Sequence, residues 1–410
     1  MRRGEDLMES WQWDREMGLD AEVIAAGRRQ IAAALDTLET LLDNPSARTN
    51  DLYSAGFRLS MGQGVVGLLP EDRARAEALY RRVFAAGGAG SRYMQEGLLL
   101  LLAATEDAAS IPFWLEIVDW NRPRDQAGAI RRRIAPAALA RLAARRNVPE
   151  AYAALRTLLH HPHPEVRALS ARDLSRAYWE VERPLPPEVA DELADLALHD
   201  KDFMPRFEAR EALHAAGLPL SPGNLGGSYT FKVKPRRTTG INRTIEVLSQ
   251  QSLDDLHLAI QDAFDWDNDH LYSFYLTTGA NRDDYEIACA MAEGDWSGSP
   301  FLQIGALGDG PEPAGSANGD EDDEAGGGPL TTADAVIGAL GLGLKHKFIY
   351  LFDYGDQNEF EVQVVSIQAH AAPGDYPRIV ASEGKAPAQY AVWDDEEDEG
   401  YEDGDDSDDA

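Results

Sequence analysis

Apolar residues recur at helical spacing through the first part of the chain. Residues 20–43 place seven of them on one stripe, namely Val23, Ile24, Ile31, Leu35, Leu38, Leu41 and Leu42. Residues 71–86 form a second predicted helix. The apolar run from Gly97 to Ala104 predicts a buried helix, because it is far shorter than the ~20 residues of a bilayer span. We therefore expect a helical segment over residues 1–90 and further helices after it.

A repeat follows between residues 91 and 217. Arg132, Arg167 and Arg206 align with one another, as do Leu139, Leu174 and Leu213, at steps of 35 and 39 residues. Predicted helices over 112–120, 149–160 and 187–199 precede these positions and begin near proline, which suits a first helical turn. Two helices in each period of 35–40 residues predict an α-solenoid. The run 159–174 resembles a HEAT-type repeat, and the resemblance implies a scaffold in which Arg167 and Arg206 tie one repeat to the next.

The pattern changes from helical to alternating after a proline- and glycine-rich linker over residues 218–227. Alternation predicts strands over 228–235, 241–248, 271–277, 347–356 and 359–368, with a capped helix at 252–264 and a short helix at 331–340. This order predicts an α+β domain over 228–390 with a largely antiparallel sheet. The fold class is thus multi-domain, a helical array followed by an α+β domain.

The charge of the chain is concentrated in two acidic segments. The net charge is −33, but the insert 308–328 and the tail 391–410 together hold 19 acidic residues, and without them the body carries about −14. We expect both segments to be disordered, since they cannot bury enough apolar surface to offset their ordering entropy. The single cysteine, Cys289, and the absence of an apolar run behind the first arginines favour a cytoplasmic protein without a signal peptide.

The densest chemistry lies between the predicted helix at 252–264 and the strand that follows it. His257, His270, Asp353 and Asp356 are candidate catalytic groups, because imidazoles and carboxylates at strand ends can transfer protons. Asp267, Asp269 and His270 are candidate metal ligands. The alternative is structural: Asp and Asn favour turns, and His257 on the apolar stripe could simply satisfy a buried partner. We expect no cofactor.

Five cations accompany the first strand pair: Lys232, Lys234, Arg236, Arg237 and Arg243. With nearby aromatic residues they could bind single-stranded nucleic acid. They could equally protect an exposed sheet edge from aggregation. Trp266 and Tyr272 are further candidate binding residues.

Four blocks in the second half carry a resemblance: Ile241-Asn-Arg-Thr-Ile245, Leu253-Asp-Asp-Leu-His-Leu-Ala-Ile-Gln261, Ala263-Phe-Asp-Trp266 with His270-Leu-Tyr-Ser-Phe274, and Phe348-Ile-Tyr-Leu-Phe-Asp-Tyr-Gly-Asp356. Over residues 228–390 the chain resembles the Ri-plasmid open-reading-frame-three family, often labelled passenger TnpR proteins of an insertion element. Relatives usually carry Trp and His where this chain has Asn358 and Phe360. Ser10 lacks the arginine cluster that a recombinase nucleophile needs.

These observations favour a non-enzymatic interaction protein that binds a protein partner through its helical repeats and its α+β module. Two alternatives stay open, a nucleic-acid-associated protein linked to mobile elements and a metal-dependent hydrolase using the His/Asp cluster. We expect no membrane partner.

Overall fold

The structure is a computed structural model that describes residues 21–44, 50–51, 54–55, 68, 70–87, 91–120, 127–218, 226–279, 282–289 and 330–390. The predicted acidic insert at 308–328 and tail at 391–410 lie outside the described residues. The chain divides into two compact units, one holding residues 1–223 with 295–329 and 338–342, and the other holding the remainder.

Helices build the first unit. They are α2 (Ala21–Asp43), α4 (Pro70–Ala86), α5 (Ser91–Thr105), η1 (Ala108–Ser110), α6 (Ile111–Val118), α7 (Gly128–Arg146), α8 (Pro149–Leu158), α9 (Pro164–Trp179), α10 (Pro187–His199) and α11 (Phe203–Ala215). The predicted helical first half is confirmed at this level. No helix in the described part of the chain is both long enough and apolar enough to cross a bilayer.

Proline and turn residues set the helix ends. Helices α8, α9 and α10 each begin at a proline, whose missing N–H would have no intrahelical partner in the first turn. His163 caps α9 by accepting a hydrogen bond at Nδ1 from the Glu165 amide, at 3.3 Å. Helix α7 ends at Asn147, which adopts the left-handed conformation that asparagine tolerates (φ 49°).

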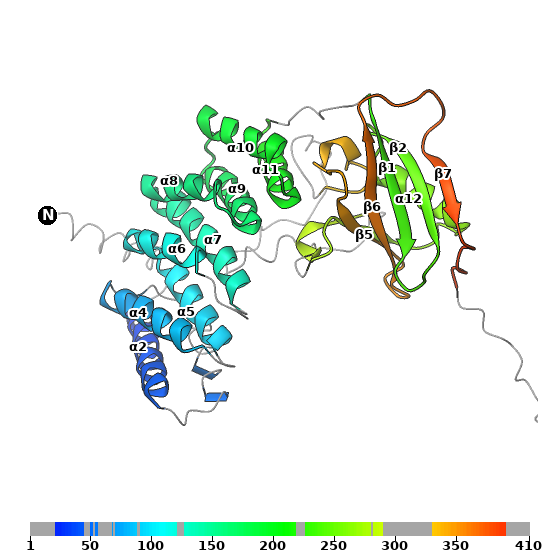
Figure 1. Cartoon of the computed structure of the whole chain (residues 1–410). Coiled ribbons are helices and arrows are strands. Elements are labelled where there is room, and N and C mark those ends of the chain that lie inside the picture. Colours follow the sequence, from blue (N-terminus) through cyan, green and yellow to red (C-terminus); the bar gives the residue numbers. More distant parts are fainter. Residues whose placement is uncertain are drawn as a thin grey trace, which may run out of the picture. The chain divides into compact units, whose positions relative to one another are not determined.

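Helix α9 packs between α7 and α11, and α6, α8 and α10 pack beside these helices (Figure 1). The shared core is aliphatic, with Leu139, Leu155, Leu174 and Leu193 all fully buried. Burial of each such side chain contributes about 1.5–3 kcal/mol, so tertiary packing rather than helix propensity holds these short helices.

Ion pairs link each helix pair to the next. Arg132 Nε lies 2.6 Å from Glu165 Oε2, and Arg167 Nε lies 2.7 Å from Asp200 Oδ2. Arg167 also contacts Asp202 at 2.8 Å. Burial is the largest single influence on Asp200 and would raise its pKa. The hydrogen bonds from Arg167 and the Asp202 amide, with the charges of Arg167 and Arg206, together hold that pKa below its usual value. Arg206 Nη1 donates to the Asp200 carbonyl at 2.7 Å.

The second unit contains a seven-stranded sheet in the order β4-β3-β5-β6-β1-β2-β7. The strands are β1 (Ser228–Pro235), β2 (Asn242–Leu248), β3 (Tyr272–Tyr275), β4 (Glu286–Ala288), β5 (Lys347–Phe352), β6 (Asn358–Gln368) and β7 (Arg378–Glu383). Every neighbouring pair is antiparallel, as predicted.

One face of this sheet carries an aromatic core, beneath helix α12 (Leu253–Phe264). Its fully buried rings are Phe231, Phe264, Phe274, Phe348, Tyr350, Phe352 and Phe360. Side chains alternate between the two faces, so Phe231 and Val233 lie on the core face while Lys232 and Lys234 lie on the other. A smaller buried cluster of Tyr275, Ile349 and Leu351 lies on that second face.

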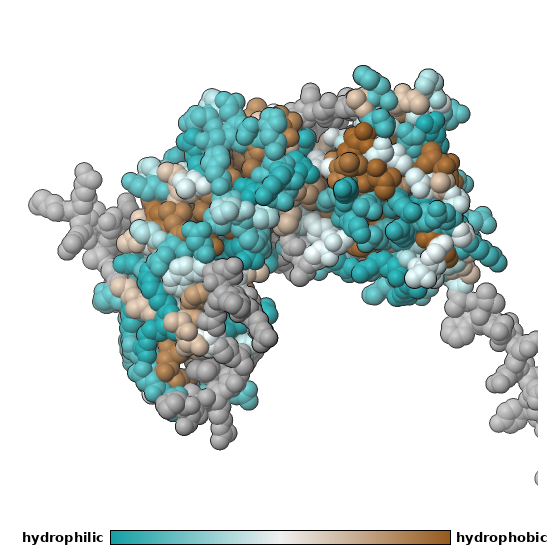
Figure 2. All heavy atoms as spheres, in the orientation of Figure 1, coloured by the Kyte–Doolittle hydropathy of each residue, from teal (hydrophilic) through white to brown (hydrophobic). Residues whose placement is uncertain are grey.

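Two segments in the second half of the chain differ from the sequence prediction. Residues 331–340 were predicted as a helix, but they form turns and the short 3₁₀ helix η3 (Ile337–Ala339), and Gly341 at φ 73° follows. Strand β7 was not predicted; its side chains are mostly exposed, including Ile379 and Val380. Figure 2 shows brown hydrophobic patches among hydrophilic residues on this unit.

Candidate functional site

Helix α12 is fixed at both ends by its own sequence. Ser252 Oγ accepts a hydrogen bond from the Asp255 amide at 3.2 Å, and Asp255 Oδ2 accepts one from the Ser252 amide at 2.8 Å. This reciprocal capping box satisfies two backbone donors and fixes where the helix starts. Asp265 ends it in the left-handed conformation (φ 56°). The register of the helix turns His257 toward the sheet.

His257 is completely buried and belongs to a chain of hydrogen bonds. Its Nε2 lies 2.9 Å from Asn268 Oδ1, which can only accept, so Nε2 carries the proton and donates. Its Nδ1 then accepts from the Tyr350 hydroxyl at 2.7 Å, and that hydroxyl accepts from Gln261 Nε2, also at 2.7 Å. The imidazole stacks on Tyr272 with ring centroids 3.5 Å apart. This arrangement needs a neutral imidazole.

The environment of His257 agrees with that requirement. Burial lowers its pKa to about 4, although the hydrogen bond to Asn268 and the charge of Asp254 act in the opposite direction. A group with this pKa stays neutral at neutral pH and has no access to solvent. His257 therefore has the surroundings of a structural group rather than of a proton-transfer catalyst.

The two aromatic candidates next to this helix are also engaged. Tyr272 is 6% exposed, and its hydroxyl donates to Asp254 and lies 3.1 Å from Thr332 Oγ1. Trp266 packs edge-on against Phe360, and its Nε1 donates to the Pro387 carbonyl at 2.9 Å. Both rings therefore pack the region between α12 and β3 against the rest of the domain.

His270 lies on the surface beside Asp269. Its Nδ1 is 2.8 Å from Asp269 Oδ1, and its Nε2 is 3.6 Å from Asp353 Oδ2. The Asp269 hydrogen bond raises the pKa of His270. The hydroxyl of Tyr390 donates to Asp269 Oδ2, and this bond, with the His270 bond, lowers the pKa of Asp269. Gln389 Nε2 donates to Asp269 Oδ1 at 2.9 Å, so one aspartate serves three side chains.

Among the remaining aspartates, the Asp353 carboxylate accepts from backbone amides, whereas Asp267 and Asp356 take part through their own main-chain groups. The Asp267 amide donates to Gln389 Oε1 at 2.6 Å. Asp353, at φ 61°, accepts at Oδ1 from the Gly355 and Asp356 amides at 2.8 and 3.3 Å. Asp353 thus closes the turn from β5 to β6 in the way aspartate commonly does.

The structure brings His270, Asp269 and Asp353 together, but it places His257 in the core and Asp356 in the turn. Within the described ranges, no group of three or more His, Cys, Asp or Glu residues could hold a metal ion. The proposed metal ligands Asp267, Asp269 and His270 instead meet the segment that contains Gln389 and Tyr390.

Arg243 is separated from the other basic candidates. Arg243 is 6% exposed, and its guanidinium donates to the carbonyls of Ala263 at 2.7 Å and Glu383 at 2.9 Å while lying over the Phe264 ring. Arg236 pairs with Glu359, and Arg237 Nη1 donates to the Asp356 carbonyl at 3.2 Å. Lys232 and Lys234 lie half-buried on the opposite face from Arg243. Arg243 therefore does not share a surface with Lys232 and Lys234.

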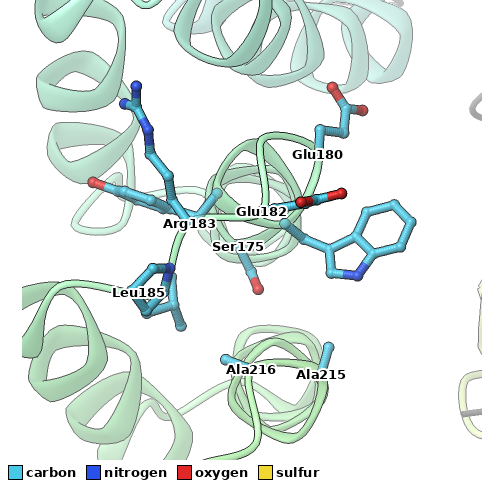
Figure 3. Close-up of a pocket in the computed structure, with 10 residues that line it drawn as sticks. Ser175, Glu180, Glu182, Arg183, Leu185, Ala215 and Ala216 are labelled. Atoms are coloured by element: carbon cyan, nitrogen blue, oxygen red, sulfur yellow. The ribbon is translucent and has the colours of Figure 1, made fainter. Parts of the chain in front are cut away.

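A pocket in the helical unit was not predicted. It has a volume of about 600 Å³ and lies where α9 and α11 end. Its lining is Ser175, Tyr178, Trp179, Glu180, Glu182, Arg183, Pro184, Leu185, Ala215 and Ala216 (Figure 3). Trp179 is 69% exposed, more than any other large hydrophobic side chain in the described part of the chain. No predicted helix reached Trp179, so the sequence carried no signal for this pocket.

Comparisons with known proteins find a family match for one of the two units. A solved structure of a protein of unknown function from Methanosarcina mazei Go1, MM3350, is similar at 23% identity, covering 39% of this chain and 71% of that one with a TM-score of 0.27. The curated proteins contain no significant match. Residues 228–397 match the family model described as Plasmid pRiA4b ORF-3-like protein, so the second half of the chain carries a domain of that family.

Proposed function

We propose that this chain is a non-enzymatic interaction protein whose helical unit is a HEAT-type α-solenoid that binds a protein partner. The pairs α6–α7, α8–α9 and α10–α11 support the solenoid, because the second helix of each pair packs on that of the next. The links Arg132–Glu165 and Arg167–Asp200 also support it, since each spans 33 residues. The family domain would act as a second binding module, and a cytoplasmic location stays a prediction.

The observation that carries this proposal is the exposure of Trp179 beside the pocket. Tryptophan is a large hydrophobic residue, and at protein interfaces it often contributes most of the binding energy. A hollow of about 600 Å³ next to it offers a partner side chain a place to insert. Exposed apolar residues of this kind typically mark a surface that another molecule covers.

The candidate chemistry in the sheet unit supports binding over catalysis. The protons and lone pairs of His257, Asp269 and Asp353 are engaged by neighbouring side chains and backbone amides. The nucleic-acid and hydrolase alternatives have less support, because Arg243 is buried away from Lys232 and Lys234. The carboxylates of Asp269 and Asp353 are also already engaged.

Affinity purification from cells that naturally contain the protein tests this proposal. We compare the unaltered chain with Trp179→Ala and with Leu198→Ala, a control that removes another exposed apolar side chain, on α10 (48% exposed). Proteins recovered with the unaltered chain and with Leu198→Ala, but lost with Trp179→Ala, would support the proposal. Equal recovery with all three would show that the pocket is not the binding surface.

A further inference from the structure

The pocket beside Trp179 is negatively charged on one side. Glu180 and Glu182 extend together on that side, and Arg183 extends toward the opposite side (Figure 3). Arg183 Nη1 donates to Asn147 Oδ1 at 2.8 Å, which holds the arginine away from the two carboxylates. Glu180 Oε1 accepts from Arg176 at 3.0 Å, whereas Glu182 has neither an ion pair nor a side-chain hydrogen bond among the described residues. Glu182 therefore keeps its full capacity to accept.

Two helix ends add to this charge. Helix α9 ends at Trp179 and helix α11 ends at Ala215, so both present C-terminal carbonyl groups near the pocket. The C-terminus of a helix carries a partial negative charge, which favours a bound cation and disfavours an anion. Glu182 is in the left-handed conformation (φ 53°), where its amide donates to the Trp179 carbonyl at 2.9 Å. The turn thereby fixes the backbone of Glu182 next to that of Trp179, and both side chains line the pocket.

The remaining lining is apolar. Leu185, Pro184, Ala215 and Ala216 provide aliphatic surface, and Tyr178 and Trp179 provide aromatic surface. An arginine side chain combines the features that match this lining. Its aliphatic stem covers apolar surface, its planar guanidinium stacks on an aromatic ring, and its donor pairs fit a carboxylate.

We propose that this pocket binds an arginine side chain from a basic segment of the protein partner, with the guanidinium stacked on Trp179 and donating to Glu182. The inference rests on the proposed function and names the chemistry of the partner. Nucleic acid fits poorly, since its phosphates would meet two carboxylates and two helix C-termini.

Fluorescence polarisation with short labelled peptides tests the proposal on the full chain at about 150 mM salt, where long-range attraction is screened. The first probe has arginines spaced among leucine and serine residues. Matched probes carry lysine, glutamine or glutamate in place of the arginines, and a single-stranded oligonucleotide is included. The protein variants are Trp179→Ala, Glu182→Gln and Asp191→Asn; the last removes an equal charge from an exposed position on α10.

We expect the arginine probe to bind most tightly. Trp179→Ala should weaken it about tenfold or more, and Glu182→Gln about threefold to tenfold, from the loss of stacking and of a charge-assisted hydrogen bond. Asp191→Asn should bind like the unaltered chain. Equal affinity across all variants would place the binding elsewhere on this acidic protein and overturn the proposal.

Two other outcomes separate this inference from the function it rests on. Trp179-dependent binding of the glutamine or glutamate probe would overturn the arginine assignment while leaving a protein-binding pocket in place. Trp179-dependent binding of the oligonucleotide would contradict the assignment of a basic protein segment. A failed affinity purification, by contrast, would remove the proposed function itself.

Discussion

Two regions differ in how many of their polar groups remain free to bind another molecule. One is the corner of the sheet unit, formed by His257, Asp269, His270 and Asp353, and the other is the pocket of the helical unit. The corner contains the histidines and aspartates that the sequence makes conspicuous, yet most of their polar atoms have partners within the protein. The pocket contains one exposed tryptophan and one unpaired glutamate, which attract no notice in the sequence. Chemical richness along the chain is therefore a poor guide here to which side chains remain free to bind another molecule.

The largest effect is expected from a variant of Arg243, which tests whether this arginine stabilises the fold. Arg243→Ala removes a buried guanidinium and leaves carbonyl groups such as those of Ala263 and Glu383 without their donor. We expect the unfolding free energy of the sheet unit to fall by about 3–5 kcal/mol. Hydrogen exchange of β2 and α12 in rising denaturant measures it. A change below about 0.5 kcal/mol would instead fit a surface cation reserved for a ligand.

His257 gives the next largest effect, and one that depends on pH. Its folded pKa of about 4 lies below the unfolded value of 6.5, so the unfolded chain binds a proton first as pH falls. The contribution of neutral His257 to the free energy of unfolding is fully present above pH 6.5. It is lost as pH falls from 6.5 to 4, and the loss totals about 3 kcal/mol.

The variant His257→Gln removes this titration. The difference in unfolding free energy between the unaltered chain and the variant should therefore shrink as pH is lowered through that window, measured by hydrogen exchange of α12. A difference that stays constant from pH 7 to pH 4 would contradict a neutral, buried His257. Titration of the histidine NMR signals should also show His270 above its ordinary pKa, because Asp269 accepts its hydrogen bond.

The smallest effect is expected at the pocket. Trp179→Ala removes a side chain that is 69% exposed, so little apolar area returns to water and the unfolding free energy should change by less than about 0.5 kcal/mol. Thermal and denaturant unfolding check this. A loss of 2 kcal/mol or more would mean that Trp179 supports the fold and is not held ready for a partner.

Strong local patterns were predictable from the sequence. The helices and most strands followed from periodicity, and the capping box of α12 was visible in Ser252 and Asp255. The helix predicted over 331–340 was wrong. Its apolar spacing suggests a helix, but Gly338 and Gly341 favour turns. Strand β7 escaped detection because an exposed edge strand has no alternation between buried and polar positions.

The site was less predictable than the fold. Whether His257 or Asp353 is free or engaged depends on residues far away in the chain, such as Tyr350 93 positions after His257. Trp179 presented the reverse problem, since a tryptophan at the end of a helix is usually buried. Only the meeting of α9 and α11 ends, more than 30 residues apart, creates its pocket.

The most direct test of the account compares the two regions in one experiment. Partner recovery is measured for the unaltered chain, for Trp179→Ala in the pocket and for His270→Ala at the corner, with hydrogen exchange confirming that each protein is folded. We predict that Trp179→Ala loses the partner and that His270→Ala retains it. Retention by Trp179→Ala with loss by His270→Ala would contradict the account.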